Sequence, residues 1–257
     1  MLVLTDPDDP RLDDFRSMRN RERTDALYAE GVTVIERLCE SGLAIRSVLV
    51  NPHTYERIRP LIGDRATVFV VERDVIREVV GFDLHLGAIA LADRPEPTPL
   101  DRILLTARRL VLLEGLNDHV NLGAIARSAR ALGADALVLD PTCTDPWYRR
   151  SVRVSMGELL RLPVARSTDW SATLDEIAGA GVEVWALTPD ATAHDLYDLA
   201  VPERLAIAVG AEGPGLSART LGARTNVRIP MQNGVDSLNV GHAVAVALAI
   251  ARPSRGA

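Results

Sequence analysis

The second half of the sequence alternates short apolar runs with helix-like segments, and this alternation limits the possible folds more than any other feature. The runs cover residues 110–115, 136–140, 182–187 and 205–210. Alternation of this kind predicts an α/β fold in which helices cover both faces of a mostly parallel sheet. Such sheets bind ligands in the loops at the carboxyl ends of their strands. A site is therefore expected after Gly115, after Gly210 and at the entry to the last helix.

A proline-rich stretch separates this region from the first part of the chain. Three prolines within 95–99 disfavour a helix and favour an extended connection. We predict a first domain over 1–94, a linker over 95–101 and a second domain over 102–257. The alternative is a long loop inside a single domain.

The first domain is predicted to be a small α/β domain. Thr24 is expected to cap a helix that Gly42 ends. Two apolar runs, 47–50 and 67–71, read as short buried strands, and a helix-like stretch at 55–61 lies between them.

The charged residues exclude several function classes. All 29 basic residues are arginine, so the chain has neither the lysine of a phosphate-binding P-loop nor a Schiff-base lysine. The net charge of −6 argues against a generic nucleic-acid coat. A nucleic-acid substrate would need a local arginine-rich surface. The candidates are an early group with Arg19 and Arg21, and a later group with Arg149, Arg150 and Arg153 beside Trp147 and Tyr148.

The two arginine groups differ in what accompanies them. The later group combines cations with aromatic rings on which unpaired bases could stack. The early group reads equally well as a solvated charge cluster.

Cysteine usage and hydropathy suggest a cytoplasmic protein without a metal site. Cys39 and Cys143 belong to no paired motif, so we expect two core residues rather than a zinc site or a disulfide. No apolar run reaches the roughly 18 to 20 residues that span a membrane. The first residues lack the basic and apolar regions of a secretion signal.

Three motifs carry candidate polar chemistry. The first, NLGAIARSA at 121–129, opens a helix for which Asn121 is the expected N-cap, with Arg127 farther along. A solvated surface charge is the alternative for Arg127. The second, VGAEGPGL at 209–216, does not match the dinucleotide-binding glycine spacing. Its Glu212 is suited to orient an arginine, or is a surface turn residue.

The third motif, IPMQNGVDSLNV, covers 229–240. Ser237 is its expected N-cap. Asn239 places an amide beside an apolar helix start, where an unsatisfied polar group is costly. A polar ligand would remove that cost.

The order of these motifs resembles that of the SpoU, or TrmH-type, RNA ribose 2′-O-methyltransferases of the SPOUT superfamily. The resemblance covers 108–252, including the segment 153–164 between the first two motifs. The first domain is similar to the ribosomal-protein-like α/β RNA-recognition domain of that family. The sequence departs from the family pattern at two places. Gly241-His242 follows SLNV, where smaller or apolar residues are expected, and Leu86 in HLG stands where the family often has arginine.

The resemblance implies a deep trefoil knot in the second domain, a homodimer and S-adenosylmethionine as the cofactor. It implies methylation of a ribose 2′-hydroxyl in structured RNA, above all ribosomal RNA. The implied catalytic residues are Arg127, Asn121, Glu212, Ser237 and Asn239. The implied cofactor-binding residues are Leu187, Thr188, Val209, Gly210, Gly213, Gly215, Ile229, Met231, Ser237 and Leu238.

In similar proteins, the arginine matching Arg127 activates the hydroxyl. Because a guanidinium normally stays protonated in proteins, Arg127 either acts as that base or binds the neighbouring phosphate. Three other functions stay open. One is a non-catalytic RNA-binding or ribosome-assembly factor on the same fold, which failure to bind the cofactor would reveal. The others are a transfer-RNA 2′-O-methyltransferase and a small-molecule methyltransferase, and the extra first domain argues against the last.

Overall fold

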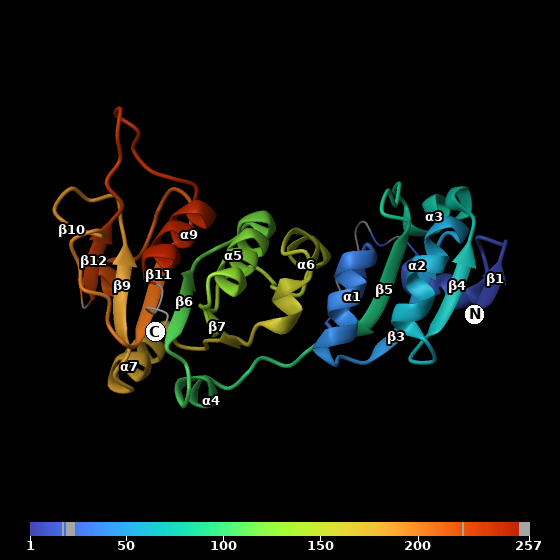
Figure 1. The fold of residues 1–257 in the computed structure, drawn as a ribbon, viewed down its shortest axis with the longest axis horizontal. Coiled ribbons are helices and arrows are strands. Elements are labelled where there is room, and N and C mark those ends of the chain that lie inside the picture. The colour runs from blue at the N-terminus through green and yellow to red at the C-terminus, as the bar shows by residue number, and fades with distance from the viewer. Residues whose placement is uncertain (17, 19–23, 223, 252–257) are drawn as a thin grey trace, which may run out of the picture. The chain divides into compact units, whose positions relative to one another are not determined.

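The computed structural model describes residues 1–16, 18, 24–222 and 224–251. The chain forms two compact units (Figure 1). Unit 1 consists of Met1–Glu96 and Pro146–Arg161, and unit 2 consists of Pro97–Asp145 and Leu162–Ala257.

Unit 1 is a five-stranded mixed sheet with helices, in the order β1-β4-β3-β5-β2. Strands β1, β4 and β3 are parallel, and β5 runs antiparallel to both β3 and β2. The elements that precede residue 97 are β1 Leu2–Leu4, η1 Pro10–Phe15, β2 Ala26–Glu30, α1 Val32–Ser41, β3 Ile45–Val50, α2 Pro52–Ile62, β4 Thr67–Val71, α3 Arg73–Val80 and β5 Ala88–Asp93.

The predicted strands of unit 1 are present, but its first helix begins later than expected. Gly31, not Thr24, is the N-cap of α1, and the residues between them form β2. The apolar side chains of Ala26–Glu30 are all buried in the sheet, so tertiary packing outweighs the helical spacing of the sequence. Gly42 ends α1 in the left-handed conformation, as expected.

The segment 146–161 belongs to unit 1, which differs from the continuous second domain expected over 102–257. It contains α6 Arg149–Val154 and η3 Glu158–Arg161. Its ion pairs explain the placement: Arg149 lies 3.0 Å from Glu30, Arg37 lies 3.0 Å from Glu158, and Arg161 lies 3.0 Å from Glu40. The segment lies between the motifs of unit 2 in the sequence, so its position along the chain does not indicate these pairs with distant residues.

Unit 2 contains the expected α/β architecture. Its seven strands have the order β10-β12-β9-β11-β6-β7-β8, and every pairing between them is parallel. The elements of unit 2 are α4 Leu100–Leu104, β6 Arg109–Glu114, α5 His119–Ala131, β7 Ala136–Leu139, β8 Val164–Arg166, α7 Trp170–Gly179, β9 Glu183–Leu187, β10 His194–Asp195, β11 Leu205–Gly210, α8 Ala218–Gly222, β12 Thr225–Arg228 and α9 Val240–Ile250.

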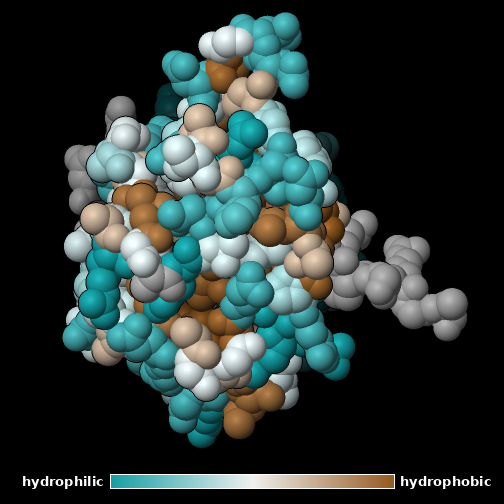
Figure 2. Space-filling model, turned by 90° about the vertical axis from the view of Figure 1, so that its left-hand side faces the viewer, coloured by the Kyte–Doolittle hydropathy of each residue, from teal (hydrophilic) through white to brown (hydrophobic). Residues whose placement is uncertain are grey.

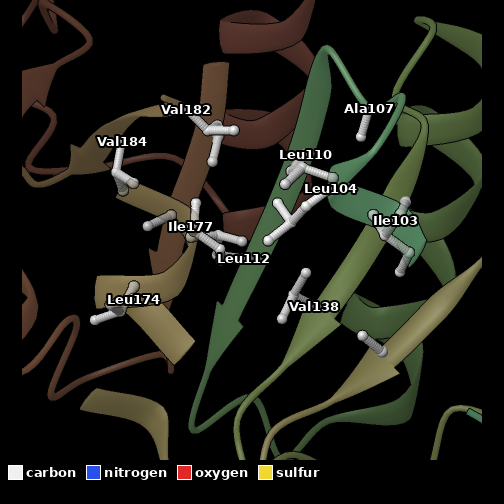
Figure 3. Close-up of a cluster of buried hydrophobic side chains, with 14 of the residues drawn as sticks. Ile103, Leu104, Ala107, Leu110, Leu112, Val138, Leu174, Ile177, Val182 and Val184 are labelled. Atoms are coloured by element: carbon white, nitrogen blue, oxygen red, sulfur yellow. The ribbon is translucent and has the colours of Figure 1, made fainter. Parts of the chain in front are cut away.

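The central strands β6, β7 and β11 are buried along nearly their whole length because helices cover both faces of the sheet. Side chains from α4, α7 and alternate positions of β6, β7 and β9 meet in one core (Figure 3). Helices α5 and α9 pack against each other, and α9 also contacts β11. The rigid central strands hold the loops that follow them. Within the described residues, no helix is both long enough and apolar enough to cross a membrane.

Candidate functional site

A pocket of about 600 Å³ lies where three loops meet in unit 2. These loops follow β9, β11 and β12, and the first turn of α9 completes the wall. Figure 1 shows the segment between β12 and α9 rising above the sheet. Figure 2 faces this end of the molecule and shows apolar surface exposed in hollows between hydrophilic side chains. The volume falls within the range of small-molecule and cofactor sites.

The loop after β11 has a backbone that only glycine allows at one point. A Cβ atom at Gly210 would overlap the carbonyl group of Gly215 and the backbone nitrogen of Leu216. The loop closes on itself through a hydrogen bond from the Gly215 N–H to the Ala211 carbonyl, 3.0 Å long. Gly213 has a φ of +92° and open space where a Cβ would lie. The loop therefore exposes backbone to the pocket.

Three side chains connect this loop to α5 and α9. The Asn121 amide donates to Glu212 Oε1 at 2.9 Å. The Asn239 amide donates to the same oxygen at 3.0 Å and to Asn121 Oδ1 at 2.9 Å. The carboxylate thus accepts two amide hydrogen bonds, and no described arginine contacts it. Glu212 therefore orients two asparagines, whereas the sequence suggested that it would orient an arginine.

The caps of the two helices differ from the expected ones. Asp118 is the N-cap of α5, and its carboxylate accepts the backbone N–H of Asn121 at 2.7 Å. Asn239, not Ser237, is the N-cap of α9 and accepts the Gly241 N–H at 2.9 Å. Asn239 is exposed, and both asparagine side chains form hydrogen bonds within the protein, so Asn239 needs no ligand to satisfy its amide.

Arg127 lies apart from this network. It is exposed on α5 and is not among the residues that line the pocket. No described residue forms an ion pair or side-chain hydrogen bond with it. The guanidinium is therefore accessible to a ligand outside the pocket.

The structure brings all the residues expected to bind the cofactor to one pocket wall, although their binding role stays a prediction. Glu212, Ser237 and Asn239 line the same wall, and Asn121 joins it through its hydrogen bonds. The site residues named from the sequence leave out nine further lining residues, which are Pro189, Ala191, Ala211, Val227, Arg228, Val235, Asp236, Val240 and Ala243. Each lies within the second or third motif or within four residues of a named site residue, and that position is the signal that could have included it.

The candidate RNA-binding arginines have different environments. The guanidinium of Arg149 pairs with Glu30 at 3.0 Å and lies 4.3 Å from the Phe82 ring centre. Arg153 lies 3.6 Å from the same buried carboxylate. Arg150 is exposed and has no partner in the part of the chain that the structure describes. Arg19 and Arg21 lie outside the described residues.

The aromatic residues beside these arginines are less exposed than a stacking surface requires. Trp147 is only 6% exposed, and Tyr148 is half-buried. Contrary to the expectation, the buried ring of Trp147 therefore offers no exposed surface on which an unpaired base could stack.

The cysteines and acidic residues do not form a metal site in the described ranges. Cys39 and Cys143 are both free thiols, and only Cys143 is buried. Burial raises the pKa of the Cys143 thiol to about 12. Its Sγ donates to the Leu113 carbonyl and accepts the Leu116 N–H. Cys143 is a structural residue that joins the loop after β7 to the end of β6.

Comparison with known proteins identifies the family. The profile of the SpoU rRNA methylase family matches residues 108–249, which include all three motifs. The chain belongs to this family. It is therefore an RNA methyltransferase. The family that was predicted from the order of the three motifs is confirmed.

Relatives extend the similarity over nearly the whole chain. An uncharacterised tRNA/rRNA methyltransferase of Mycobacterium tuberculosis is 42% identical, over 94% of this chain and 88% of the relative. A 23S rRNA (guanosine(2553)-2′-O)-methyltransferase of Bacillus subtilis is 27% identical, over 90% of each chain.

Solved structures show the same architecture. The AdoMet-bound rRNA methyltransferase of Sinorhizobium meliloti has a TM-score of 0.83 and 26% identity, and the similarity covers 97% of this chain and 96% of that one. The SpoU methyltransferase AviRb of Streptomyces viridochromogenes has a TM-score of 0.81 and 26% identity, with coverages of 94% and 95%. The similarity includes unit 1, so both halves of the chain have counterparts in these enzymes.

Proposed function

We propose that the chain transfers the methyl group of S-adenosylmethionine to a ribose 2′-hydroxyl of ribosomal RNA. The observation that carries this proposal is that the second and third motifs line one pocket of about 600 Å³, and that Asn121 of the first motif is hydrogen-bonded to Glu212 in its wall. The 23S rRNA 2′-O-methyltransferase among the relatives supports the substrate class, and the AdoMet-bound Sinorhizobium structure supports the cofactor.

The pocket has the chemistry that this cofactor requires. Apolar side chains of Leu187, Ile229 and Leu238 suit the adenine ring, and the glycine loop offers backbone groups for hydrogen bonds. Two carboxylates, Glu212 and Asp236, and one guanidinium, Arg228, line the pocket, so negative charge predominates and favours a cationic ligand. When bound, S-adenosylmethionine supplies an electrophilic methyl group on a positively charged sulfur.

The residues around the pocket have distinct roles in this proposal. Glu212 fixes the two asparagine amides, and Ser237 adds a hydroxyl to the wall beside them. Arg127 would bind the RNA phosphate next to the target ribose and stabilise the negative charge that develops on the 2′-oxygen. A permanently charged planar guanidinium suits that role better than the role of a base. As the methyl–oxygen bond forms, the methyl–sulfur bond of the cofactor breaks, and the hydroxyl proton passes to solvent water.

Unit 1 is proposed to recognise the RNA, with Arg150 as one contact because it is exposed and has no described partner. The proposed assembly is a homodimer, with the end of unit 2 threaded as a trefoil knot. The partly exposed face of α9 supports the dimer, since it carries small apolar side chains around His242. A protein that modifies ribosomal RNA works where ribosomes assemble, so we propose a cytoplasmic location.

Titration calorimetry and methyl transfer test this function together. The protein should bind S-adenosylmethionine in the presence of a metal chelator, and should transfer a labelled methyl group to ribosomal RNA more efficiently than to transfer RNA. Preferred labelling of transfer RNA would reassign the substrate. Binding of RNA without any cofactor binding would favour a non-catalytic assembly factor.

A further inference from the structure

Glu114 is a half-buried carboxylate at the end of β6 that does not line the cofactor pocket. It is the register partner of Gly210, where β11 ends and the glycine loop begins. A carboxylate at the end of a central strand is costly to desolvate unless hydrogen bonds compensate. Its partners therefore indicate why it is there.

Both oxygens of Glu114 bind the far end of the glycine loop. Oε1 accepts the Ser217 backbone N–H at 3.3 Å, and Oε2 accepts the Thr220 hydroxyl at 2.7 Å. Thr220 is fully buried, and its oxygen also accepts the Trp170 indole N–H at 3.3 Å. Glu114 thus links the start of α8 to the strand beside the loop.

The loop between these points has little freedom to compensate for a shift. Its return leg at Gly215 and Leu216 crosses so close to Gly210 that a Cβ there would overlap it. Leu216 is buried in the sheet core just before Ser217. A displacement of Ser217 would therefore move Gly213 and Gly215, which line the pocket.

We propose that Glu114 is a positioning residue that sets the cofactor-binding conformation of the glycine loop from outside the pocket. Asn121 and Asn239 hold the tip of the loop through Glu212, and Glu114 holds its base through Ser217 and Thr220. This inference rests on the proposed cofactor pocket. It adds a residue with no contact to the cofactor.

Two nearly isosteric variants test the link from its two sides. Glu114→Gln removes the charge and one acceptor, and Thr220→Val removes the hydroxyl while keeping the shape. Each should raise the dissociation constant of S-adenosylmethionine at least about tenfold, which corresponds to about 1.4 kcal/mol. The double variant should be no worse than the more severe single variant, because both break the same link. Glu203→Gln is the control, since that side chain is 81% exposed.

A second readout separates positioning from general damage to the fold. At saturating cofactor, the single-turnover rate of methyl transfer in each variant should stay within about twofold of the unmodified protein, because the reacting groups are unchanged. If Glu114→Gln fails to fold, Thr220→Val alone decides.

Each other outcome is informative. Unchanged cofactor affinity in the folded variants would overturn the positioning role, and so would a rate that stays low at saturating cofactor. If the unmodified protein and the Glu203→Gln control also fail to bind S-adenosylmethionine, the proposed function fails, and this inference fails with it.

Discussion

Three side chains from distant parts of the sequence form the polar centre of the site, and each has its own reason to be there. Asn121 lies in the first turn of α5 because Asp118 caps that helix. Asn239 caps α9 and still has its amide free to donate. Glu212 lies on a loop whose return leg passes so close to its start that only glycine fits at Gly210. Two of the proposed catalytic residues lie outside this network: Ser237, which lines the pocket, and Arg127, which does not.

Arg127 separates catalysis from cofactor binding. Arg127→Ala should leave the affinity for S-adenosylmethionine nearly unchanged, while single-turnover methyl transfer falls at least about 100-fold. Arg127→Lys should restore little, because an ammonium lacks the planar donor geometry. Arg130→Ala is a matched control, as it removes another exposed arginine of α5. Equal rates for all three variants would remove Arg127 from the mechanism.

Cys143 should be chemically silent in the folded protein. Because its pKa is raised from 9.0 to about 12, the thiol stays protonated at pH 8, and only a thiolate is nucleophilic. In Cys39→Ser it is the one cysteine left. Iodoacetamide should modify it at least about 100-fold more slowly in the folded than in the denatured chain, since each pKa unit changes the thiolate fraction tenfold.

The pH dependence of that reaction gives the contrary test. At every pH between 7 and 9, the rate constant in the folded chain should stay at least about 100-fold below that in the denatured chain. Equal rate constants in the two states would show that Cys143 is not protected.

At the scale of elements, the central strands of unit 2 could be predicted, but β2 and the helix starts could not. The apolar runs of unit 2 are long enough, and contain few enough polar residues, to indicate buried strands. The starts of α5 and α9 each offer two capping residues, Asp118 or Asn121 and Ser237 or Asn239. Local preference does not choose between them, because all four side chains are good caps. Contacts with Glu212 favour the observed arrangement.

The glycine loop shows a similar limit. Its glycines are visible in the sequence, but the crossing of Gly210 by Gly215 is a property of the folded loop. Likewise, an arginine that binds RNA and one that pairs with a distant glutamate look the same in a sequence. Arg149 and Glu30 are 119 residues apart.

Gly210→Ala should damage the loop far more than a typical helix substitution. The added methyl group overlaps backbone that cannot move independently, so we expect a loss of about 1–3 kcal/mol in unfolding free energy and at least about tenfold weaker cofactor binding. Gly179→Ala, at the end of α7, is the control because open space surrounds its Cβ position. Similar cofactor affinity in the two variants would show that the loop adapts.

At the scale of the whole molecule, the chain enters unit 1 twice. The segment 146–161 leaves unit 2 between β7 and β8 and packs on α1 and β2. A chain that begins after Pro99 would lack the rest of unit 1. It would therefore expose the surface of the segment 146–161 that packs on α1 and β2. The two units therefore cannot be separated by dividing the sequence at a single position.

Glu30 tests how much this segment contributes to stability. Its side chain is 4% exposed and pairs with both Arg149 and Arg153. Glu30→Ala should lower the unfolding free energy by about 2–3 kcal/mol, less than a fully buried pair loses because Arg153 can reach water. Glu56→Ala breaks an exposed pair with Arg59 and should cost less than about 0.5 kcal/mol. Equal urea denaturation midpoints would contradict the assigned role of Glu30.

The central claim is that this chain methylates a ribose of ribosomal RNA. It is tested most directly by mapping 2′-O-methyl groups in total RNA from cells with the gene, without it, and with the gene restored as either the unmodified form or Arg127→Ala. One ribosomal RNA methyl group should disappear without the gene and return only with the unmodified form. Identical ribosomal RNA maps in all four strains would contradict the account.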